Sequence, residues 1–456
     1  MSSLNASLAI ALSGLSADEG ALTATTNNVA NVNTPGYSRE VPVLVASDPV
    51  IDDPLTLGTG VTLQSIQSIR DPILESQIQQ ETQTQGQLNS QVSALEQAQT
   101  SFTSTTGDIG TAISNFFDSL NQLSTSPSDL SLRQGVLTAA GNVASAFNTA
   151  ANQLTSQRTS LDQNVVQTVG QINQLTTQIA QLNGQIASLQ NVGQSAGTFE
   201  DQRTQLIDQL SSLVDVSVIP TDNTLTLTTS NGTALVAGQQ SFALTTQPDA
   251  SGVQHIYSQG SDITSSIVSG QLGGVLQARD QQIPAIQQQL DTLASSLANA
   301  VNQVQNGGTD LNGDPGANIF TPPPATGAAA SLSVAMTDPS GIAASSDGSS
   351  GSNGNIETMY ALRNQTFVDN ETPSDYYSSI VFNVGNAASN ATAEQNASNL
   401  VLQQLNDQRS SVSGVSLDEE AANMIQYQQA YAASAQVVTA INDMMNAVIN
   451  MATLTG

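Results

Sequence analysis

The stretch DLNGDPGANIF places Asp310, Asn312 and Asp314 at alternate positions, which is the spacing of the first three ligands in an EF-hand calcium loop. The sixth position of that loop requires glycine and the twelfth requires a bidentate glutamate, but here they are Pro315 and Thr321. A turn built from Asp, Asn, Gly and Pro explains the same residues without a metal. We therefore interpret the stretch as a turn and predict no metal and no other cofactor.

Side chains that could carry catalysis are scarce. His255 is the only histidine and the chain has no cysteine, so a typical zinc site is excluded. The sequence contains neither a G-x-S-x-G nucleophile motif nor a glycine-rich phosphate loop. Adjacent acids such as Glu200-Asp201 and Glu419-Glu420 point in different directions on a helix or strand, which makes them poor acid–base pairs. We predict that the protein is not an enzyme.

The charge balance excludes several classes of partner. The 456 residues include 37 acidic and 8 basic residues, all of the latter arginine, for a formal charge of -29. Nucleic acids and anionic membrane surfaces require a basic stripe, which scattered arginines do not form, so we exclude nucleic acid. No apolar run approaches the ~20 residues that cross a bilayer, so no membrane insertion is expected. The N-terminus lacks the basic region of a secretory signal, so any export must use a route without a cleavable signal.

Both ends of the chain show apolar residues at heptad spacing, the pattern of long coiled-coil helices. The N-terminal series is Leu8, Leu15, Leu22 and Val29, and the C-terminal series is Leu417, Met424, Tyr431, Val438 and Met445. Tyr427, Ile441 and Val448 lie outside this narrow seam and widen the C-terminal apolar face. Because a single pair of such helices would leave apolar surface in water, we expect neighbouring copies of the chain to cover it.

The interior of the chain is also mainly helical. Residues 72–123, 161–190 and 269–305 have the periodicity of long helices, and Pro284 should kink the last of these or mark its first turn. Residues 214–268 are short segments rich in Val, Leu and Thr and separated by turns, which predicts a small antiparallel β domain. Residues 321–355 are rich in Gly, Pro, Ser and Ala, which indicates a flexible loop or a reduced insertion.

We therefore predict a mainly α fold with three parts. A coiled-coil inner domain is formed by residues 1–35 and 415–456. A helical rod domain is formed by residues 36–213, 269–320 and 356–414. The small antiparallel β domain is inserted into this rod.

Three stretches resemble a known family. ALSGLSADEGALTATTNNVANVNTPGYSRE (11–40) is similar to the signature shared by the axial proteins of the bacterial flagellum, namely its rod, hook and hook-associated proteins. Residues 269–320 and 396–451 resemble the hook-associated proteins of the hook–filament junction. These stretches cover both chain ends and the central helix, and the β segment is not diagnostic.

The resemblance implies a structural adaptor at the hook–filament junction, which assembles as a ring on the distal end of the hook through its terminal helices. It implies four partners: the flagellar hook protein, a second junction protein, other copies of the chain and a type III export chaperone. It also implies an extracellular location after type III export through the growing flagellum. Two alternatives stay open, namely another axial protein of the hook or distal rod type, and a surface adhesin or enzyme carried on flagellar-type termini.

Four asparagines, which are poor helix formers, close the first predicted helix: Asn27, Asn28, Asn31 and Asn33. Pro35 and Gly36 fit the second and third positions of a turn that redirects the chain. Amides can bond to neighbouring subunits without the desolvation cost of ions, so we hypothesise that these asparagines also contact other copies. Replacing Asn28 and Asn31 by serine is then expected to weaken assembly and to leave the monomer folded.

Overall fold

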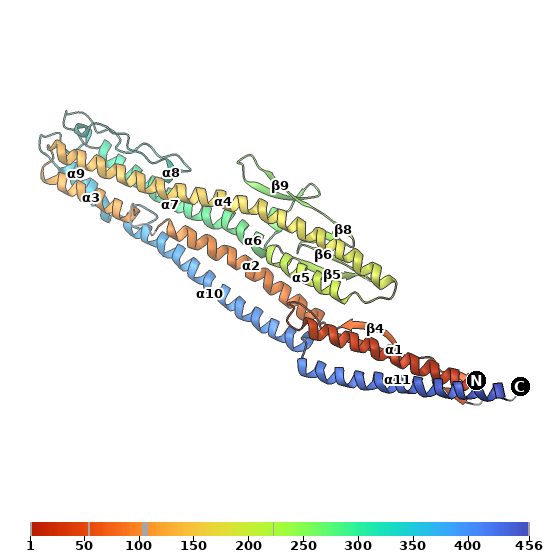
Figure 1. The fold of residues 1–456 in the computed structure, drawn as a ribbon. Helices are drawn as coiled ribbons and strands as arrows, with labels where there is room; N and C mark the ends of the chain where they lie inside the picture. The colour runs from red at the N-terminus through yellow and green to blue at the C-terminus, as the bar shows by residue number, and fades with distance from the viewer. Residues whose placement is uncertain (1, 53–54, 103–107, 222, 455–456) are drawn as a thin grey trace.

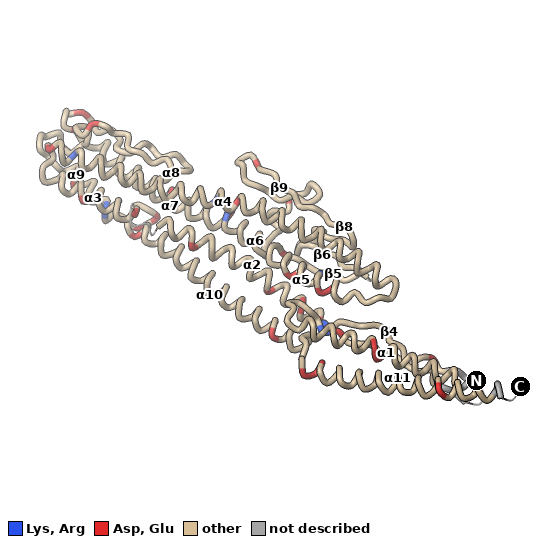
Figure 2. The backbone as a smooth tube through the Cα atoms, in the orientation of Figure 1, with Lys and Arg blue, Asp and Glu red and all other residues tan. Residues whose placement is uncertain are grey.

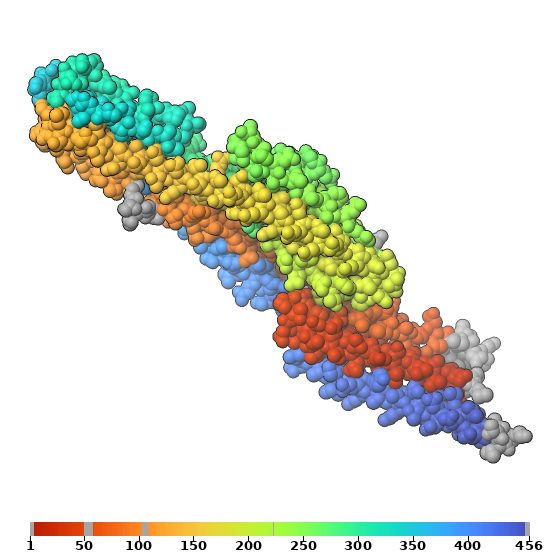
Figure 3. Space-filling view, turned by 45° about the horizontal axis from the view of Figure 1, so that its top comes forward, coloured from red at the N-terminus to blue at the C-terminus, as the bar shows by residue number. Residues whose placement is uncertain are grey.

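The computed structural model describes residues 2–52, 55–102, 108–221 and 223–454, and it shows an elongated molecule with both chain ends at one tip (Figure 1). A narrow arm, formed by the two terminal helices, continues into a thicker helical rod, and a β domain lies along one side of the rod (Figure 3). The predicted mainly α fold is confirmed. The predicted inner domain includes residues 1 and 455–456, which lie outside the described residues.

The arm consists of α1 (Ser2–Asn31) and α11 (Leu417–Leu454), which run antiparallel and pack against each other (Figure 1). The first turn of α11 carries three acidic residues, whose charges favour the positive end of the helix dipole. The buried apolar residues of α1 are all alanines: Ala11, Ala17, Ala21 and Ala24. Small side chains let the two helix backbones approach closely.

A β hairpin follows α1 and packs along it. Its stem pairs β1 (Glu40–Ala46) with β4 (Val61–Ser68), and β2 (Val50–Asp52) pairs with β3 (Leu55–Leu57) beyond the stem. The predicted helical rod domain begins at residue 36, but residues 40–68 form this hairpin and not a helix. The alternating, Val-rich segments EVPVLVA and VTLQSIQS carried the missed strand signal.

The rod is built from helices that lie side by side along its axis (Figure 1). They are α2 (Pro72–Thr100), α3 (Ile109–Thr125), α4 (Leu130–Asn191), α5 (Gly197–Leu213), α6 (Gly270–Gln277), α7 (Ile283–Asn306), α9 (Gly354–Ala361) and α10 (Pro373–Ser413). Helix α4 alone has 62 residues, about 93 Å at 1.5 Å per residue. Pro284 lies in the first turn of α7, directly after the π-helical segment η2 (Ala278–Gln282), which confirms one of its two predicted roles.

The β domain contains two antiparallel sheets and falls within the predicted residues 214–268. The first sheet has the order β5 (Ser217–Thr221), β6 (Thr224–Thr228), β7 (Ala234–Ala237), β8 (Gln240–Ser241). The second has the order β11 (Ser261–Asp262), β10 (Gln254–Ser258), β9 (Leu244–Pro248), and η1 (Thr264–Ser266) leads back to the rod. Side-chain amides of α4 hold both sheets: Asn183 donates to the carbonyls of Leu225 and Gly238, and Asn173 bonds to both backbone groups of Leu244.

Residues 321–355 pack onto the rod and do not project from it as a free loop. The carboxylate of Asp291 on α7 accepts hydrogen bonds from the amides of Gly327 and Ala329 at 2.8 Å each. The side chain of Arg133 on α4 is 2% exposed and donates to the carbonyl of Ile342 at 2.6 Å. The segment contains α8 (Ala328–Ser331) and η3 (Pro339–Gly341), and η4 (Leu362–Asn364) follows α9.

Candidate functional site at the joint of arm and rod

Helix α11 turns a different face toward α1 than the predicted heptad series. The buried residues of its described part are Glu420 and Ile441, which belong to a series shifted by three positions, and Tyr427, Ser434 and Val448 of that series are half-buried. Ile441 is 4% exposed, whereas Leu417 and Tyr431 of the predicted series are 53% and 38% exposed. The prediction was wrong about the seam because the residues of α1 that meet this series include Gly14, Asp18 and Asn28, which a pattern of large apolar residues does not reveal.

None of the apolar residues predicted to contact other copies is fully buried within the chain. Seven are half-buried (Leu8, Leu15, Leu22, Val29, Met424, Val438 and Met445), while Leu417 and Tyr431 are exposed. Further large apolar side chains are exposed on the same two helices: Ile10, Leu12, Ile425, Val437, Met444, Ile449 and Met451. We call the exposed members of both sets the apolar surface of the arm.

Asn28 lies at the centre of the joint, where α1, the hairpin and α11 meet. Its side chain is 1% exposed. The amide nitrogen donates to the carbonyl of Glu40 at 2.8 Å and to the Glu420 carboxylate at 3.1 Å. The amide oxygen accepts from the backbone amide of Glu40 at 2.8 Å and from the hydroxyl of Tyr37 at 2.9 Å. One side chain therefore connects three segments of the chain, two of them 392 positions apart.

Burial is the largest cause that raises the pKa of the Tyr37 phenol, and the negative charges of Glu40, Asp201 and Glu420 raise it further. The phenol therefore keeps its proton at neutral pH and acts as a donor to Asn28. The Asn28 amide oxygen therefore faces two donors, and its amide nitrogen faces two acceptors.

Arg39 connects the hairpin to the first turn of α11. Its Nε contacts Glu420 Oε1 at 2.7 Å, and its Nη1 contacts Glu419 Oε2 at 3.0 Å. The backbone amide of Arg39 donates to the carbonyl of Ser413 at 2.9 Å, at the end of α10. Because the Glu420 side chain is 1% exposed, its charge depends on this guanidinium and on the Asn28 amide for compensation.

Arg70 connects the hairpin to the rod. Its guanidinium contacts Asp201 Oδ1 at 2.7 Å and pairs with Glu200, both near the start of α5. Asp201 also accepts a hydrogen bond from the backbone amide of Ser38 at 3.0 Å. Charged residues are sparse along the whole molecule (Figure 2), so the placement of Arg39, Arg70 and Arg409, three of its eight arginines, at the joint marks it as an electrostatic centre.

The turn predicted at Pro35-Gly36 is confirmed. The amide of Tyr37 donates to the carbonyl of Thr34 at 3.2 Å, and Gly36 has φ = +76°, a value that favours glycine at the third turn position. Pro35 occupies the second position. This turn reverses the chain between α1 and the hairpin.

The structure divides the four asparagines by role. Asn28 is enclosed within its own chain, so the predicted contact with another copy is wrong for this residue. Asn27 donates to the Glu40 carboxylate at 3.0 Å, and Asn31 donates to the carbonyl of Asn27 at 3.0 Å as it ends the helix. The side chain of Asn33 is exposed, and its contact with another copy remains a prediction.

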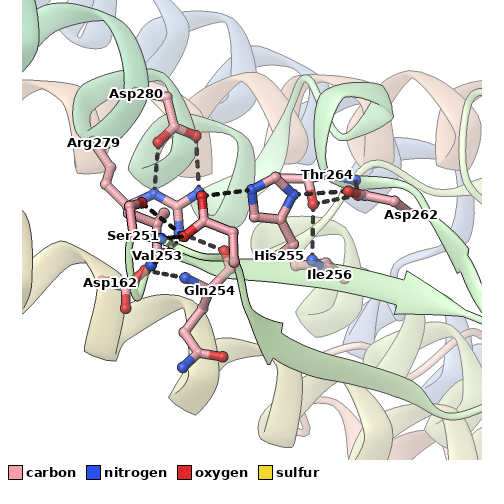
Figure 4. Close-up of polar contacts among 11 residues, drawn as sticks. Asp162, Ser251, Val253, Gln254, His255, Ile256, Asp262, Thr264, Arg279 and Asp280 are labelled. Atoms are coloured by element: carbon pink, nitrogen blue, oxygen red, sulfur yellow. Dashed lines mark hydrogen bonds and ion pairs between the residues drawn. The ribbon is translucent and has the colours of Figure 1, made fainter.

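A second polar cluster surrounds His255 and Arg279 (Figure 4). His255 Nδ1 lies 2.7 Å from Asp262 Oδ2, within the second sheet of the β domain. Arg279 on η2 is 1% exposed, and its Nη1 contacts Asp162 of α4 at 2.8 Å and the carbonyl of Gln254 at 2.7 Å. The arginine thereby fixes strand β10 to two rod segments, which is a structural role.

The predicted turn at Asp310 is also present. Asp310 Oδ1 accepts from the amides of Asn312 at 2.8 Å and Asp314 at 2.9 Å, so this carboxylate stabilises its own loop. Among the described residues there is no group of three or more His, Cys, Asp or Glu side chains that could hold a metal ion. Within the same described residues, no helix has the length and hydropathy needed to cross a membrane.

Comparisons with known proteins agree with this architecture. Residues 95–320 match the helical domain of flagellar hook-associated protein FlgK, residues 8–37 match the flagella basal body rod protein family, and residues 407–451 match the C-terminal family of basal body rod proteins FlgEFG. The chain is 30% identical to flagellar hook-associated protein 1 of Bacillus subtilis, over 99% of both chains. It is 26% identical to the Escherichia coli protein of the same name, over 97% of this chain and 98% of the other.

A solved structure shares the fold. The flagellar hook junction protein FlgK from Burkholderia pseudomallei aligns with a TM-score of 0.66 and 21% identity, covering 74% of this chain and 100% of that chain. The near-complete coverage by relatives, together with the arm, joint and rod described above, shows that the chain belongs to the flagellar hook-associated protein 1 family and is a structural protein of the bacterial flagellum.

Proposed function

We propose that the protein is the adaptor at the hook–filament junction, where it assembles as a ring on the distal end of the hook through its arm. The observation that carries this proposal is the apolar surface of the arm. Residues such as Ile425 (57% exposed) and Met451 (60% exposed) lie on a helix whose only buried apolar side chain among the described residues is Ile441. Such a helix gains stability when further helices cover it, and other copies carry the same surface.

The partners follow from this position. The hook protein lies below the ring, a second junction protein lies above it, and neighbouring copies cover the arm. The exposed α11 is also the surface that a type III export chaperone would cover before the chain leaves the cell through the growing flagellum. Neither arm helix contains lysine or arginine, so any ionic contact that the arm makes must use its carboxylates, and its other contacts are apolar or amide.

We also propose that the protein is not an enzyme. Both ring nitrogens of its single histidine face aspartates: Nδ1 lies 2.7 Å from Asp262, and Nε2 lies 3.8 Å from Asp249. This arrangement ties loops of the β domain together. The nearby hydroxyls of Ser251 and Thr264 donate to these same two aspartates and not to the histidine.

Electron microscopy of the purified chain mixed with isolated hooks that lack their caps tests the adaptor role. A single band of added density at the distal end is the expected result. Growth into long tubes would instead indicate a protein of the hook type. Hooks that stay bare beside a folded, soluble monomer would refute the proposal.

A matched pair of variants tests the surface itself. The double substitution Ile425→Ser and Tyr431→Ser removes two exposed apolar side chains of the arm, each worth about 1.5 kcal/mol when buried, so binding should weaken roughly 100-fold. The control is Val166→Ser on α4, which is 43% exposed and lies on the rod. Both variants should unfold like the wild type, and equal binding by the double variant would exclude the arm as the assembly surface.

A further inference from the structure

A second charged group at the joint, separate from the Arg39 and Arg70 contacts, contains two acids and one base. Glu75 lies in the first turn of α2, Asp208 on α5, and Arg409 near the end of α10. Arg409 Nη1 is 3.8 Å from Glu75 Oε2 and 3.5 Å from Asp208 Oδ2. These distances are long for charge-assisted bonds, so the guanidinium compensates both carboxylates only weakly.

Each acid also has an oxygen that is buried without a hydrogen bond. These atoms are Glu75 Oε2 and Asp208 Oδ1. An ionised oxygen removed from water without a donor is unfavourable, whereas a protonated carboxyl removes one of the two charges and supplies a donor. The geometry of the group therefore favours one proton on the pair.

Burial is the largest cause that raises the pKa of Asp208 to about 7, and the charge of Glu75 adds to it. Arg409 and a hydrogen bond from Gln79 act in the opposite direction and lower this pKa. Burial likewise raises the pKa of Glu75. The other titratable groups that face this pair are Tyr37 of the turn, Arg70 at the hairpin end, Asp71 at the start of α2 and Asp201 of α5. The charge of Arg70 lowers the pKa of Glu75 but does not outweigh burial, and its guanidinium is paired with Glu200 and Asp201.

The position of the group connects it to the arm. It lines a cavity of about 510 Å³ whose other walls are the turn at residues 31–38 and the α10–α11 connection at residues 413–415. The turn between α1 and the hairpin and the connection between α10 and α11 therefore border the same two carboxyl groups. A change of charge here acts on the two segments that set the direction of the arm.

We propose that Glu75 and Asp208 form a proton-binding site that controls the joint: the protonated pair holds the arm fixed against the rod, and loss of the proton to solvent loosens it. In the loosened joint Asp208 is hydrated and returns to its ordinary acidity. The closed joint therefore binds the proton more tightly than the open one, and it is most stable at low pH. The stability of the closed joint falls as the pH rises from about 4 to about 7 and then levels off. Over this range the equilibrium constant for opening the joint increases by at most about tenfold per pH unit.

Hydrogen–deuterium exchange of the full-length monomer between pH 5 and 8 tests the site, with protection factors corrected for the intrinsic exchange rate at each pH. In the wild type, protection of residues 31–38 and 413–416 should fall between pH 5 and 7 and then level off. Asp208→Asn should remove this slope. The control Asp118→Asn, at an exposed ion pair with Arg363, should keep the wild-type profile.

Glu75→Gln keeps the proposal testable if Asp208→Asn does not fold. Removal of the neighbouring charge lowers the pKa of Asp208, so the fall in protection should level off at a lower pH than in the wild type. A wild-type profile without a slope, a slope that persists in Asp208→Asn, or a Glu75→Gln profile identical to the wild type would each overturn the proposal.

Discussion

Replacing Asn28 by alanine should release the arm from the joint. The side chain fills its hydrogen-bonding capacity with three segments, and all four contacts are between 2.8 and 3.1 Å. Alanine leaves the backbone amide and carbonyl of Glu40 facing an empty, buried space. The other two partners lose less, because the Tyr37 hydroxyl can rotate and Glu420 keeps Arg39.

The magnitude follows from the two orphaned backbone groups. Each buried donor or acceptor left without a partner costs about 1–3 kcal/mol, and water entering the space recovers part of this. We expect about 3 kcal/mol in total. This corresponds to a roughly 150-fold increase in the opening constant of the arm, at 1.4 kcal/mol per tenfold.

Hydrogen–deuterium exchange of the purified monomer measures this opening directly. Peptides covering residues 20–40 and 417–430 should lose protection, while peptides of α4 should not change. Asn33→Ala is the matched control, because this exposed side chain makes no hydrogen bond among the described residues and should exchange like the wild type.

The variant Asn28→Asp separates shape from chemistry. It keeps the size of the side chain and the acceptor oxygen, but it replaces the donor with a second carboxylate oxygen facing the Glu420 carboxylate. It should destabilise the joint at least as much as alanine does. If Asn28→Ala exchanged within threefold of the wild type, or if Asn28→Asp were neutral, the description of this residue as the centre of the joint would be refuted.

Two further substitutions test the packing of rod and arm. Gly86→Ala should destabilise the rod by about 1–3 kcal/mol, because its Cβ would lie 2.2 Å from the carbonyl oxygen of Ser212, a backbone atom that cannot rotate away. Thermal unfolding measures this loss, and Gly135→Ala, whose Cβ would meet nothing within 4 Å, should be neutral or stabilising. Ile441→Ala should lower the local stability of the arm by about 2–3 kcal/mol, which is measured as faster hydrogen–deuterium exchange along α1. The control Met444→Ala, at a 50% exposed position, should leave this exchange unchanged. Equal effects of the two substitutions would show that Ile441 does not lie in the seam.

Local sequence pattern was enough to predict the two arm helices, the second half of α4, α7 and the β domain, but not the break between α2 and α3 or the first half of α4. The apolar spacing of α1, α4 and α11, the turn at Pro35-Gly36 and the Val- and Thr-rich strands all depend on interactions between near neighbours, which single-sequence rules describe. The same rules could have found the hairpin at residues 40–68. Its alternation was visible but lay between two stronger helical patterns.

The tertiary structure alone decided which residues form the joint and which face of α11 meets α1. Asn28 and Glu420 are 392 positions apart, so nothing in the order of residues indicates that one amide would compensate a buried carboxylate at the other end of the chain. Ile441 is buried and Leu417 is exposed because the α1 side of the seam includes Gly14, Asp18 and Asn28, and hydrophobic periodicity gives small and polar residues little weight. Charge pairing and close packing between distant segments depend on the folded arrangement, and that arrangement separates the residues that hold the monomer together from those left exposed on the arm.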